Sequence, residues 1–397
     1  MIQRKILKNG MTVVFKQRRN RVVSVAFAVR FGAMNETASN KGIAHFIEHM
    51  LYKGTPTRNA AQIATEIEKN GGELNGFTSE QVTAFWCKMP SKHIYVALDV
   101  LSDMVKNPLF DNNEVEKERN VIFEEMKMYH DSPTLYIFNE IKSLMYKGDF
   151  AIPIIGTKKS MLDNSPDKLR KVFDKVYSPK NMILCVIGDA DFEKICSFAE
   201  SNFGDNKEKV FYPKIQLNSG GIKIEKRKGV DQANLIFAYH IPLPHDDKNY
   251  AAHVLNVLMA GGMSSRLFSE IREKRNLAYA VKGINEEEKD YAYNAIYVGT
   301  TLENVHKVRE LILDEFKKVS KSLTEKELEE VKEQIIGNYM LLQEDSYNIL
   351  LELLLNEIKG NASTSDEFVN KIRSVRLEDV KKLANIKYYG FFALIPE

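Results

Sequence analysis

The sequence predicts an α+β protein of two homologous domains, each a mainly antiparallel sheet packed with helices. Three observations carry this prediction. The chain has 397 residues, more than one hydrophobic core normally supports. Segments with strand character cluster apart from segments with helix character, which is typical of α+β folds. Two stretches of the first half also have counterparts in the second half, which indicates a duplicated unit.

The internal repeats are short but consistent in their spacing. The stretch 44–51 (AHFIEHML) pairs with 252–259 (AHVLNVLM), and the same offset pairs Gly54 with Gly262 and Arg58 with Arg266. A second pairing sets 118–132 beside 332–346, and both stretches end in Asp-Ser. The polar segment 205–221 between the two halves predicts a linker. We therefore expect domains at 1–210 and 222–397.

The elements of the first half follow from local patterns. Residues 3–30 predict hairpin strands with a bend at Lys8-Asn9-Gly10, and further strands are expected at 80–89 and 181–188, which are rich in β-branched and aromatic residues. The glycine-rich segment 71–79 predicts a turn before the strand at 80–89. Apolar periodicity predicts helices at 42–54, 59–70, 91–106, 113–130, 134–146 and 166–176.

The stretch His45-Phe46-Ile47-Glu48-His49 has the clearest chemical meaning in the chain. On a helix, His45 and His49 lie on one face, where both reach a single metal ion. Zinc binds neutral imidazole readily and keeps one position for water in catalytic sites. A carboxylate that does not bind the metal can take a proton from that water, which assigns Glu48 the role of general base. The H-x-x-E-H pattern is the inverted form of the zincin helix.

A third ligand is expected on the helix at 113–130, which Asp111 or Asn112 would cap. Glu118 and Glu125 are seven residues apart on this helix, so they lie on one face together with Ile122. The other glutamates of the helix are expected to be solvated: Glu114, Glu116 and Glu124.

These residues also carry a resemblance. The run from His45 to His49, followed by the run from Glu118 to Glu125, resembles the pitrilysin or insulinase-like zinc metallopeptidases, and the chain is similar to short bacterial members and to subunits of mitochondrial processing peptidases. In that family the third zinc ligand is a Glu about 76 residues after the second His. Glu125 stands at that spacing from His49. The resemblance implies one zinc ion per chain, bound by His45, His49 and Glu125, with Glu118 orienting the ligands.

The resemblance also implies residues that bind substrate. Asn75, with its neighbours Gly76 and Phe77, would bind the peptide backbone, and the adjoining edge strand would accept the peptide as an added strand. The alternative for this segment is a glycine-rich hairpin in which Asn75 serves the geometry of the turn. Arg272 and Tyr279 would stabilise the transition state, although their charged stretch alone predicts only a helix end.

The function implied is a zinc-dependent endopeptidase that hydrolyses short or unfolded peptides inside a closed chamber. A chain of this length would supply half of that clamshell chamber, so a homodimer or a related partner chain is expected, with Arg272 and Tyr279 completing the partner's site. Two alternatives are a processing peptidase for leader or targeting sequences and a partner subunit that binds peptides without catalysis. Cobalt or manganese would fit the same ligand types, although zinc is favoured.

The composition excludes other classes of function. A formal net charge of +2 argues against a nucleic-acid surface, and no apolar run approaches the length that spans a membrane. Three cysteines without paired spacing, and no signal peptide, predict a cytoplasmic protein. In the second half Glu48, His49 and Glu125 are replaced by Asn256, Val257 and Tyr339, so we expect no zinc site there and a structural role for His253.

Overall fold

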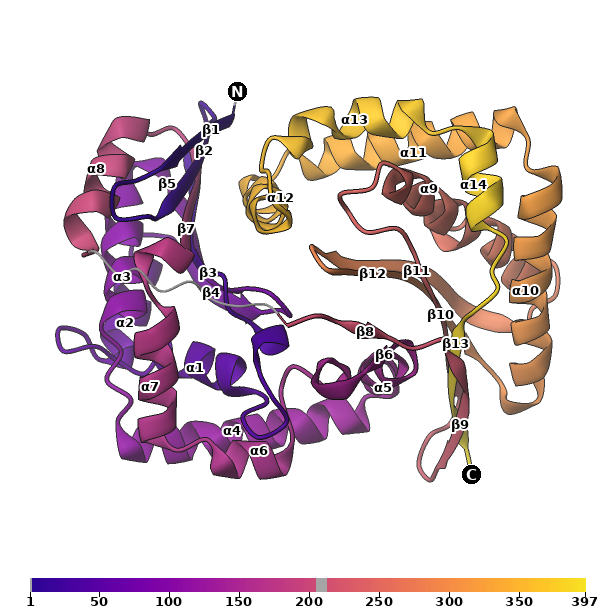
Figure 1. Ribbon diagram of the computed structural model, residues 1–397, viewed down its shortest axis with the longest axis horizontal. Helices are drawn as coiled ribbons and strands as arrows, with labels where there is room; N and C mark the ends of the chain where they lie inside the picture. Colours follow the sequence, from indigo (N-terminus) through magenta and orange to yellow (C-terminus); the bar gives the residue numbers. More distant parts are fainter. Residues whose placement is uncertain (1, 205–212) are drawn as a thin grey trace. The chain divides into compact units, whose positions relative to one another are not determined.

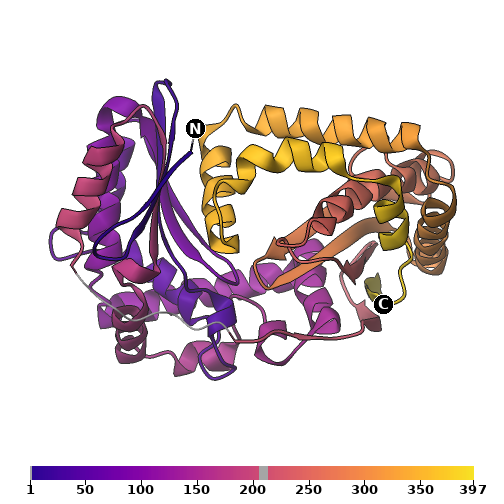
Figure 2. The same ribbon diagram turned by 45° about the horizontal axis from the view of Figure 1, so that its top comes forward.

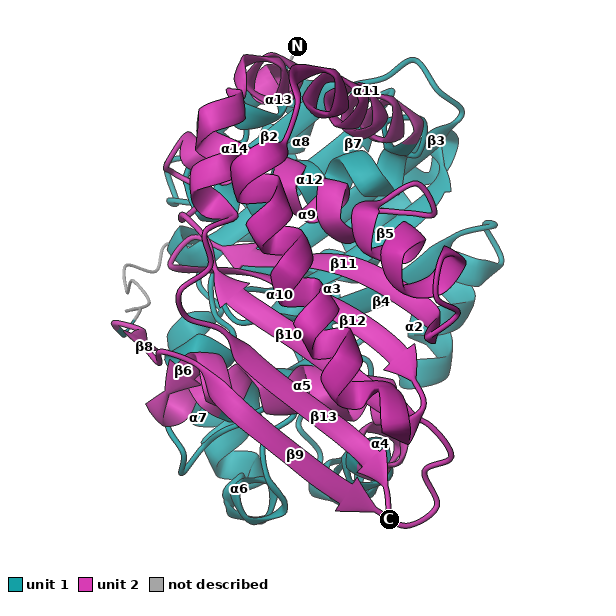
Figure 3. Cartoon of the chain, turned by 90° about the vertical axis from the view of Figure 1, so that its right-hand side faces the viewer, with its two compact units in different colours: residues 1–126, 152–213, 342–365 teal, residues 127–151, 214–341, 366–397 magenta. Residues whose placement is uncertain are grey.

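The computed structural model describes residues 2–204 and 213–397. The chain forms two compact units, each assembled from segments that are far apart in the sequence (Figure 3). Unit 1 contains residues 1–126, 152–213 and 342–365, and unit 2 contains residues 127–151, 214–341 and 366–397. Each unit has its own largely antiparallel sheet covered by helices, so the predicted α+β class with two sheet-rich domains is confirmed.

The sheet of unit 1 has the strand order β1-β2-β7-β3-β5-β4. Strands β2 and β7 pair in parallel, and the other neighbouring strands pair antiparallel. The predicted bend between the first two strands is present, because Leu7 donates to the Met11 carbonyl at 2.9 Å and Gly10 adopts a φ of +90°. The strands are β1 (Ile2–Ile6), β2 (Thr12–Gln17), β3 (Val22–Val29), β4 (Glu73–Thr78), β5 (Thr83–Pro90) and β7 (Met182–Gly188).

Helices cover both faces of this sheet. Helix α3 packs on β3 and β5, whereas α12 packs on the opposite face against β7 and β3 (Figure 1). The α12 side is an apolar core in which Leu350, Leu353 and Leu354 meet Ala26 and Ile183. The helices of this unit are α1 (Ile43–Leu51), α2 (Ala60–Glu68), α3 (Ile94–Lys106), α4 (Asn112–Asp131, whose last turn belongs to unit 2), α6 (Lys158–Asp163), α7 (Pro166–Val176), α8 (Phe192–Asn202) and α12 (Ser346–Lys359).

Unit 2 has a sheet of strand order β11-β12-β10-β13-β9 and a small sheet of β6 with β8. Helices α9 and α10 bury their apolar residues against one face of the larger sheet, and α5 packs on β10 and β13. The strands are β6 (Tyr146–Lys147), β8 (Gln216–Leu217), β9 (Gly221–Arg227), β10 (Ala233–His240), β11 (Ala278–Glu288), β12 (Tyr291–Thr300) and β13 (Gly390–Pro396). The helices are α5 (Pro133–Met145), α9 (Lys248–Ala260), α10 (Val305–Ser322), α11 (Glu325–Leu342), α13 (Thr364–Ser374) and α14 (Leu377–Leu383).

Helices α11 and α13 run side by side in unit 2 (Figure 2). The rings of Tyr339 and Phe368 lie 4.6 Å apart between them, and Lys332 donates to the Arg373 carbonyl at 3.1 Å. Tyr339 is the residue that the repeat pairs with Glu125, so this position carries an aromatic packing contact in unit 2. Within the described residues, no helix is long and apolar enough to cross a membrane.

The two sheets share one topology. Reading unit 2 as β9-β13-β10-β12-β11 gives the order β2-β7-β3-β5-β4 of unit 1, including a parallel pair at the same place. Helix α9 follows β10 as α1 follows β3. The repeat seen in the sequence is therefore a repeat of the fold.

Each of the repeated Asp-Ser pairs stands at the start of a helix that belongs to the unit built mainly from the other half of the sequence. Helix α5 follows Ser132 in the first half and belongs to unit 2, whereas α12 begins at Ser346 in the second half and belongs to unit 1. In unit 1, Glu357 of α12 is buried and accepts hydrogen bonds from Arg4 at 2.8 and 2.9 Å and from Arg30 at 3.0 Å. This helix is thus held by ion pairs as well as by its apolar face.

The structure corrects some sequence expectations. Residues 73–78 form the edge strand β4, where a turn was expected, because these residues pair with β5. Helices α6 and α8 were not expected. Residues 205–212 of the expected linker lie outside the described residues, and the remainder contains β8 and the first residue of β9. The compact units also cross the expected boundary, since 127–151 and 342–365 each belong to the unit built mainly from the other half.

Candidate metal centre

Helix α1 presents both histidines of the motif on its less buried face. The apolar residues of α1 face the core, whereas the side chains of His45 and His49 keep 13% and 20% of their surface exposed. Because residues four apart occupy neighbouring turns, the two imidazole rings lie with their centroids 4.6 Å apart. The predicted helical placement of the pair is confirmed.

Helix α4 brings two carboxylates to these rings. The helix begins after Asp111, whose side chain accepts from the backbone of Asn113 at 2.9 Å, so the expected cap is Asp111. Two turns separate Glu118 from Glu125, and both side chains point toward α1. Arg119 fastens the helix to the chain before α7 by donating to the Asn164 carbonyl at 3.2 Å.

The atoms of the predicted ligand set converge. Glu125 Oε2 lies 3.6 Å from His45 Nε2 and 3.6 Å from His49 Nε2, and one ligand atom from each residue lies within 4.8 Å of the others. Two ligand atoms of a tetrahedral zinc ion lie about 3.3 Å apart for bonds of ~2.0–2.1 Å. Buried Glu125 Oε2 has no hydrogen-bond partner among the described residues, and a buried unpaired oxygen is costly unless an ion or water satisfies it. These side chains therefore fit a zinc ion.

The protonation states of His45 and Glu125 suit cation binding. Burial, followed by repulsion from His49, lowers the pKa of His45 to about 4, so this imidazole is neutral at pH 7. Burial alone would lower the pKa of His49, but the hydrogen bond to Glu118 and the nearby carboxylates of Glu125 and Glu48 outweigh it and raise that pKa to about 9. His49 therefore has to release a proton before it can bind a metal ion at pH 7. The pKa of Glu125 lies below its ordinary value because the two histidines outweigh the effect of burial. A carboxylate and a neutral imidazole are both ready ligands.

Glu118 contacts the side of His49 that faces away from Glu125. Its Oε2 lies 3.1 Å from His49 Nδ1, and its Oε1 lies 2.5 Å from Lys53 Nζ. A carboxylate on the second ring nitrogen fixes the tautomer and orientation of a metal-binding imidazole. The predicted role of Glu118, which is to orient a metal ligand, requires this contact with His49.

Glu48 lies on α1 between the two histidines, and its carboxylate is hydrogen-bonded by a residue that the sequence analysis did not single out. Thr78, the last residue of β4, donates its hydroxyl to Glu48 Oε2 at 2.5 Å. Burial raises the pKa of Glu48, and the Thr78 hydrogen bond acts in the opposite direction. The only sequence signal for Thr78 was its place in the segment 71–79.

Gly76 of β4 leaves room for this arrangement. A methyl group at Gly76 would lie 2.6 Å from the Tyr52 hydroxyl and 3.3 Å from Glu48 Oε1. The hydroxyl of Tyr52 is buried and has no hydrogen-bond partner among the described residues. Gly76 therefore admits these two side chains against the strand, which is a structural reason for glycine beside the role in substrate binding that was expected of it.

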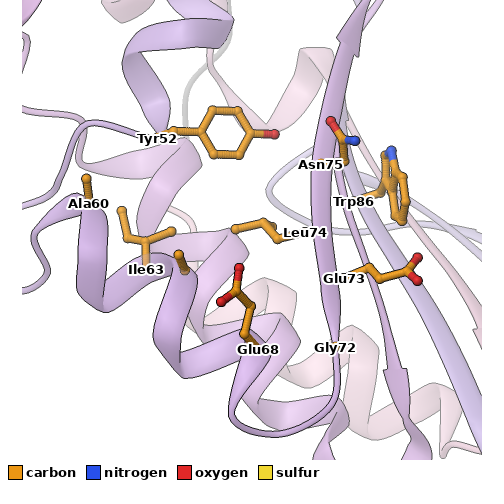
Figure 4. Close-up of a pocket in the computed structure, with 10 residues that line it drawn as sticks. Tyr52, Ala60, Ile63, Glu68, Gly72, Glu73, Leu74, Asn75 and Trp86 are labelled. Atoms are coloured by element: carbon orange, nitrogen blue, oxygen red, sulfur yellow. The ribbon is translucent and has the colours of Figure 1, made fainter.

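Strand β4 is the edge of its sheet and borders a pocket. The pocket has a volume of about 460 Å³, and Figure 4 shows Tyr52, Ile63 and Leu74 around it. Asn75 also lines it, and its side chain accepts from the Gly76 backbone at 2.8 Å. The side chain of Phe77 packs on the apolar core beneath α12, so only its backbone is at the strand edge. The full lining is Tyr52, Ala60, Ile63, Ala64, Glu68, Gly72, Glu73, Leu74, Asn75 and Trp86.

Arg272 and Tyr279 belong to unit 2 and are described within it. Arg272 lies in the π-helix Phe268–Glu273, with its guanidinium 4.7 Å from the centre of the Phe268 ring. Tyr279 is the second residue of β11 and is 50% exposed, and its hydroxyl lies 3.3 Å from that of Tyr297. His253, the counterpart of His45, lies with Nε2 3.4 Å from the carboxylate of Glu287.

Comparisons with known proteins identify the family of this chain. Residues 12–158 match the family described as insulinase (peptidase family M16), and residues 164–335 match the family described as peptidase M16 inactive domain. An uncharacterized zinc protease of Bacillus subtilis is 32% identical over 401 residues, covering 99% of this chain and 97% of its own. An uncharacterized zinc protease of Rickettsia felis is 31% identical over 385 residues, covering 96% of this chain and 93% of its own.

Solved structures show the same fold. The crystal structure of a protease from Helicobacter pylori matches with a TM-score of 0.94 at 20% identity, covering 100% of this chain and 99% of that one. An M16-like peptidase from Alicyclobacillus acidocaldarius matches with a TM-score of 0.85 at 18% identity, covering 100% of this chain and 98% of that one. From the sequence relationship and the matched families, the chain belongs to the insulinase family of peptidases, family M16.

Proposed function

We propose that this protein is a zinc-dependent endopeptidase that hydrolyses short or unfolded peptides, with one zinc ion per chain. The observation that carries the proposal is the convergence of His45, His49 and Glu125 on one point, where Glu125 Oε2 is buried without a hydrogen bond among the described residues. These three side chains would hold the ion. Zinc bound there would polarise a peptide carbonyl and lower the pKa of a water molecule.

Glu48 is the proton carrier of this mechanism. Its half-buried carboxylate accepts a proton from the attacking water and then donates it to the nitrogen of the departing amine. Because burial raises its pKa, the group lies closer to neutrality, where it both accepts and releases a proton efficiently. The Thr78 hydrogen bond occupies Oε2, which leaves Oε1 for the water.

The edge of β4 supports a peptide as the substrate. Among the described residues β4 pairs on one side with β5, and its other side has no strand partner. An extended peptide can add to such an edge through main-chain hydrogen bonds, which do not select a sequence. The pocket beside Asn75 is large enough for a substrate side chain.

The first experiment is digestion of a mixed peptide library, read by mass spectrometry. Wild type and Glu48→Gln are compared with and without a chelator, and Glu124→Gln serves as a matched control because Glu124 is exposed beside Glu125. We expect cleavage by metal-replete wild type and Glu124→Gln only. Cleavage that persists in Glu48→Gln, or in chelated wild type, would refute the proposal.

A partner subunit that binds peptides without cleaving them is a second candidate, since residues 164–335 match a domain described as inactive. Metal content separates the two. About one zinc per chain supports the peptidase, whereas absence of both zinc and cleavage supports the binding subunit. Zinc binding combined with cleavage confined to leader sequences would identify a processing peptidase.

We further propose that the active protein contains two chains, this one twice or this one with a related partner, and that Arg272 and Tyr279 act on the substrate held by the other chain. A guanidinium and a phenol are suitable donors to a developing oxyanion. Mixing Glu48→Gln with Tyr279→Phe tests this idea. Recovery of about a quarter to half of wild-type activity in the mixture supports it, and two inactive variants that stay inactive together contradict it.

A further inference from the structure

The start of α1 is capped from outside the helix. Its N-cap residue Gly42 has a φ of +85° and no side chain, so it cannot satisfy the first backbone amides. The carboxylate of Glu36 does so instead, with Oε2 accepting from Gly42 at 2.9 Å and Oε1 accepting from Ala44 at 2.7 Å. Both oxygens are thus engaged on the turn that carries His45, the next residue after Ala44.

The loop that carries Glu36 is fixed at its other end to the turn between β4 and β5. Ala33 donates to the Ser79 carbonyl at 3.0 Å, and Met34 donates to the Glu80 carbonyl at 2.8 Å. The loop also approaches this turn closely, because a methyl group at Gly32 would lie 2.5 Å from the Ser79 oxygen. The buried ammonium of Lys41 donates to the Ala33 carbonyl at 2.7 Å.

These contacts link the two elements on which the proposed chemistry depends. The turn at Ser79 follows directly on Thr78, whose hydroxyl holds Glu48 Oε2. Glu36 therefore connects the helix that carries His45, Glu48 and His49 with the end of the strand that holds Glu48. A shift of α1 along its axis would break the Glu36 contacts and the Thr78 contact together.

We infer that Glu36 is a positioning residue, which fixes the first turn of α1 so that His45 meets Glu125 and Glu48 meets Thr78. The inference rests on the proposed zinc function, but its main readout is zinc affinity and needs no peptide cleavage. A Gln side chain at this position has one carbonyl oxygen and one NH2 group, so it can accept from only one of the backbone N–H groups of Gly42 and Ala44. The other backbone N–H would face the side-chain NH2 group, which is also a donor, so the first turn of α1 would have to move.

The chain offers a matched control for ordinary helix capping. Helix α2 lies in the same unit and carries none of the proposed ligands, and its N-cap residue Asn59 accepts from the Gln62 backbone at 2.9 Å. Loss of a cap generally destabilises a protein. Asn59→Ala therefore reproduces the loss of stability without disturbing the start of α1.

The experiment measures zinc affinity by competition with a chromogenic chelator, and melting temperature, for wild type, Glu36→Gln, Glu36→Asp and Asn59→Ala. We expect Glu36→Gln to bind zinc at least about tenfold more weakly than wild type. Its kcat should fall by a larger factor than its KM changes. Asn59→Ala should bind zinc like wild type despite its lower melting temperature. The shorter Glu36→Asp, which reaches one amide, should fall between wild type and Glu36→Gln, and it replaces the latter if that variant does not fold.

Wild-type zinc affinity in Glu36→Gln or Glu36→Asp would overturn the inference, because a cap that only stabilises the fold leaves the ligands in place. Equal weakening in Asn59→Ala would also overturn it, since the effect would then follow stability in general. Failure of wild type to bind zinc would refute the proposed function itself. The two failures are thus distinguishable.

Discussion

Glu125 differs from its neighbour Glu124 only in the direction that the helix gives its side chain. We expect Glu125→Gln to retain less than about a tenth of the bound zinc after dialysis, since an amide oxygen is a far weaker ligand than a carboxylate. Glu124→Gln should keep the full content, because Glu124 is exposed. Elemental analysis measures the metal, and circular dichroism checks the fold. Full zinc content in Glu125→Gln would exclude Glu125 as a ligand.

In the proposed metal centre, Glu118 would act through its contact with His49 and not by direct contact with the metal. In Glu118→Gln the contact with His49 Nδ1 loses its charge, so we expect zinc affinity to fall about 10–100-fold without abolition of binding. Glu114→Gln, on the same helix but paired with the exposed Lys117, is the control. Competition with a chelator gives both constants, and equal affinities would remove Glu118 from the centre.

At the scale of elements, Asp103 of α3 fastens the connection between α1 and α2. It accepts hydrogen bonds from Thr55 at 2.6 Å, Thr57 at 2.7 Å, Arg58 at 2.8 Å and Asn107 at 2.9 Å. Burial opposes ionisation, but these bonds outweigh it and lower the pKa of Asp103 to about 2. A lowered pKa means that the ionised form stabilises the fold above the ordinary value near pH 4. This contribution is lost as the pH falls from about 4 toward 2.

We therefore expect Asp103→Asn to lower the free energy of unfolding by about 2 kcal/mol at pH 7. The difference from wild type should shrink between pH 4 and pH 2. Asp99→Asn is the control, since Asp99 also pairs with Arg58 but its side chain is 62% exposed, and it should cost less than about 1 kcal/mol. Urea unfolding across this pH range measures both, and a pH-independent difference would contradict the assigned pKa.

The elements that were predicted correctly are those with a strong local signal. The helices of the motif and of Glu125 have clear apolar periodicity, and the repeat in the sequence is a repeat of strand order. Strand β4 was missed because its residues are largely polar or glycine and only half-buried, as expected of a sheet edge that packs little. Thr78 and Glu36 could not be found from sequence alone, because their partners are 30 and 6–8 residues away in unrelated elements.

At the scale of the whole molecule, unit 1 depends on a segment from the end of the chain. A fragment of residues 1–210 lacks α12, so the face formed by Ala26, Ala84 and Ile183 would lose its cover. Arg4 and Arg30 would also lose Glu357. We expect this fragment to unfold at least about 15 °C below the full chain or without a cooperative transition.

Addition of a synthetic peptide of residues 342–365 should restore a cooperative transition to the 1–210 fragment, and a peptide with Glu357→Gln should restore less. Thermal melts followed by circular dichroism give the result. A fragment that melts like the full chain by itself would show that residues 1–210 form an independent domain, as the sequence suggests. The apolar residues of α12 do not state which sheet the helix covers, so its place in unit 1 could not be predicted from the sequence.

The placement of α12 delays the completion of unit 1 during synthesis. During synthesis the ribosome adds about 5–20 residues per second, so the stretch from residue 213 to residue 365 takes roughly 8–30 s. Throughout that interval the histidines and glutamates of the centre have been made, while the sheet behind them still lacks one of its covering helices. A nascent or prematurely terminated chain would therefore hold an incomplete unit 1, and the proposed peptidase activity would begin only with a nearly complete product.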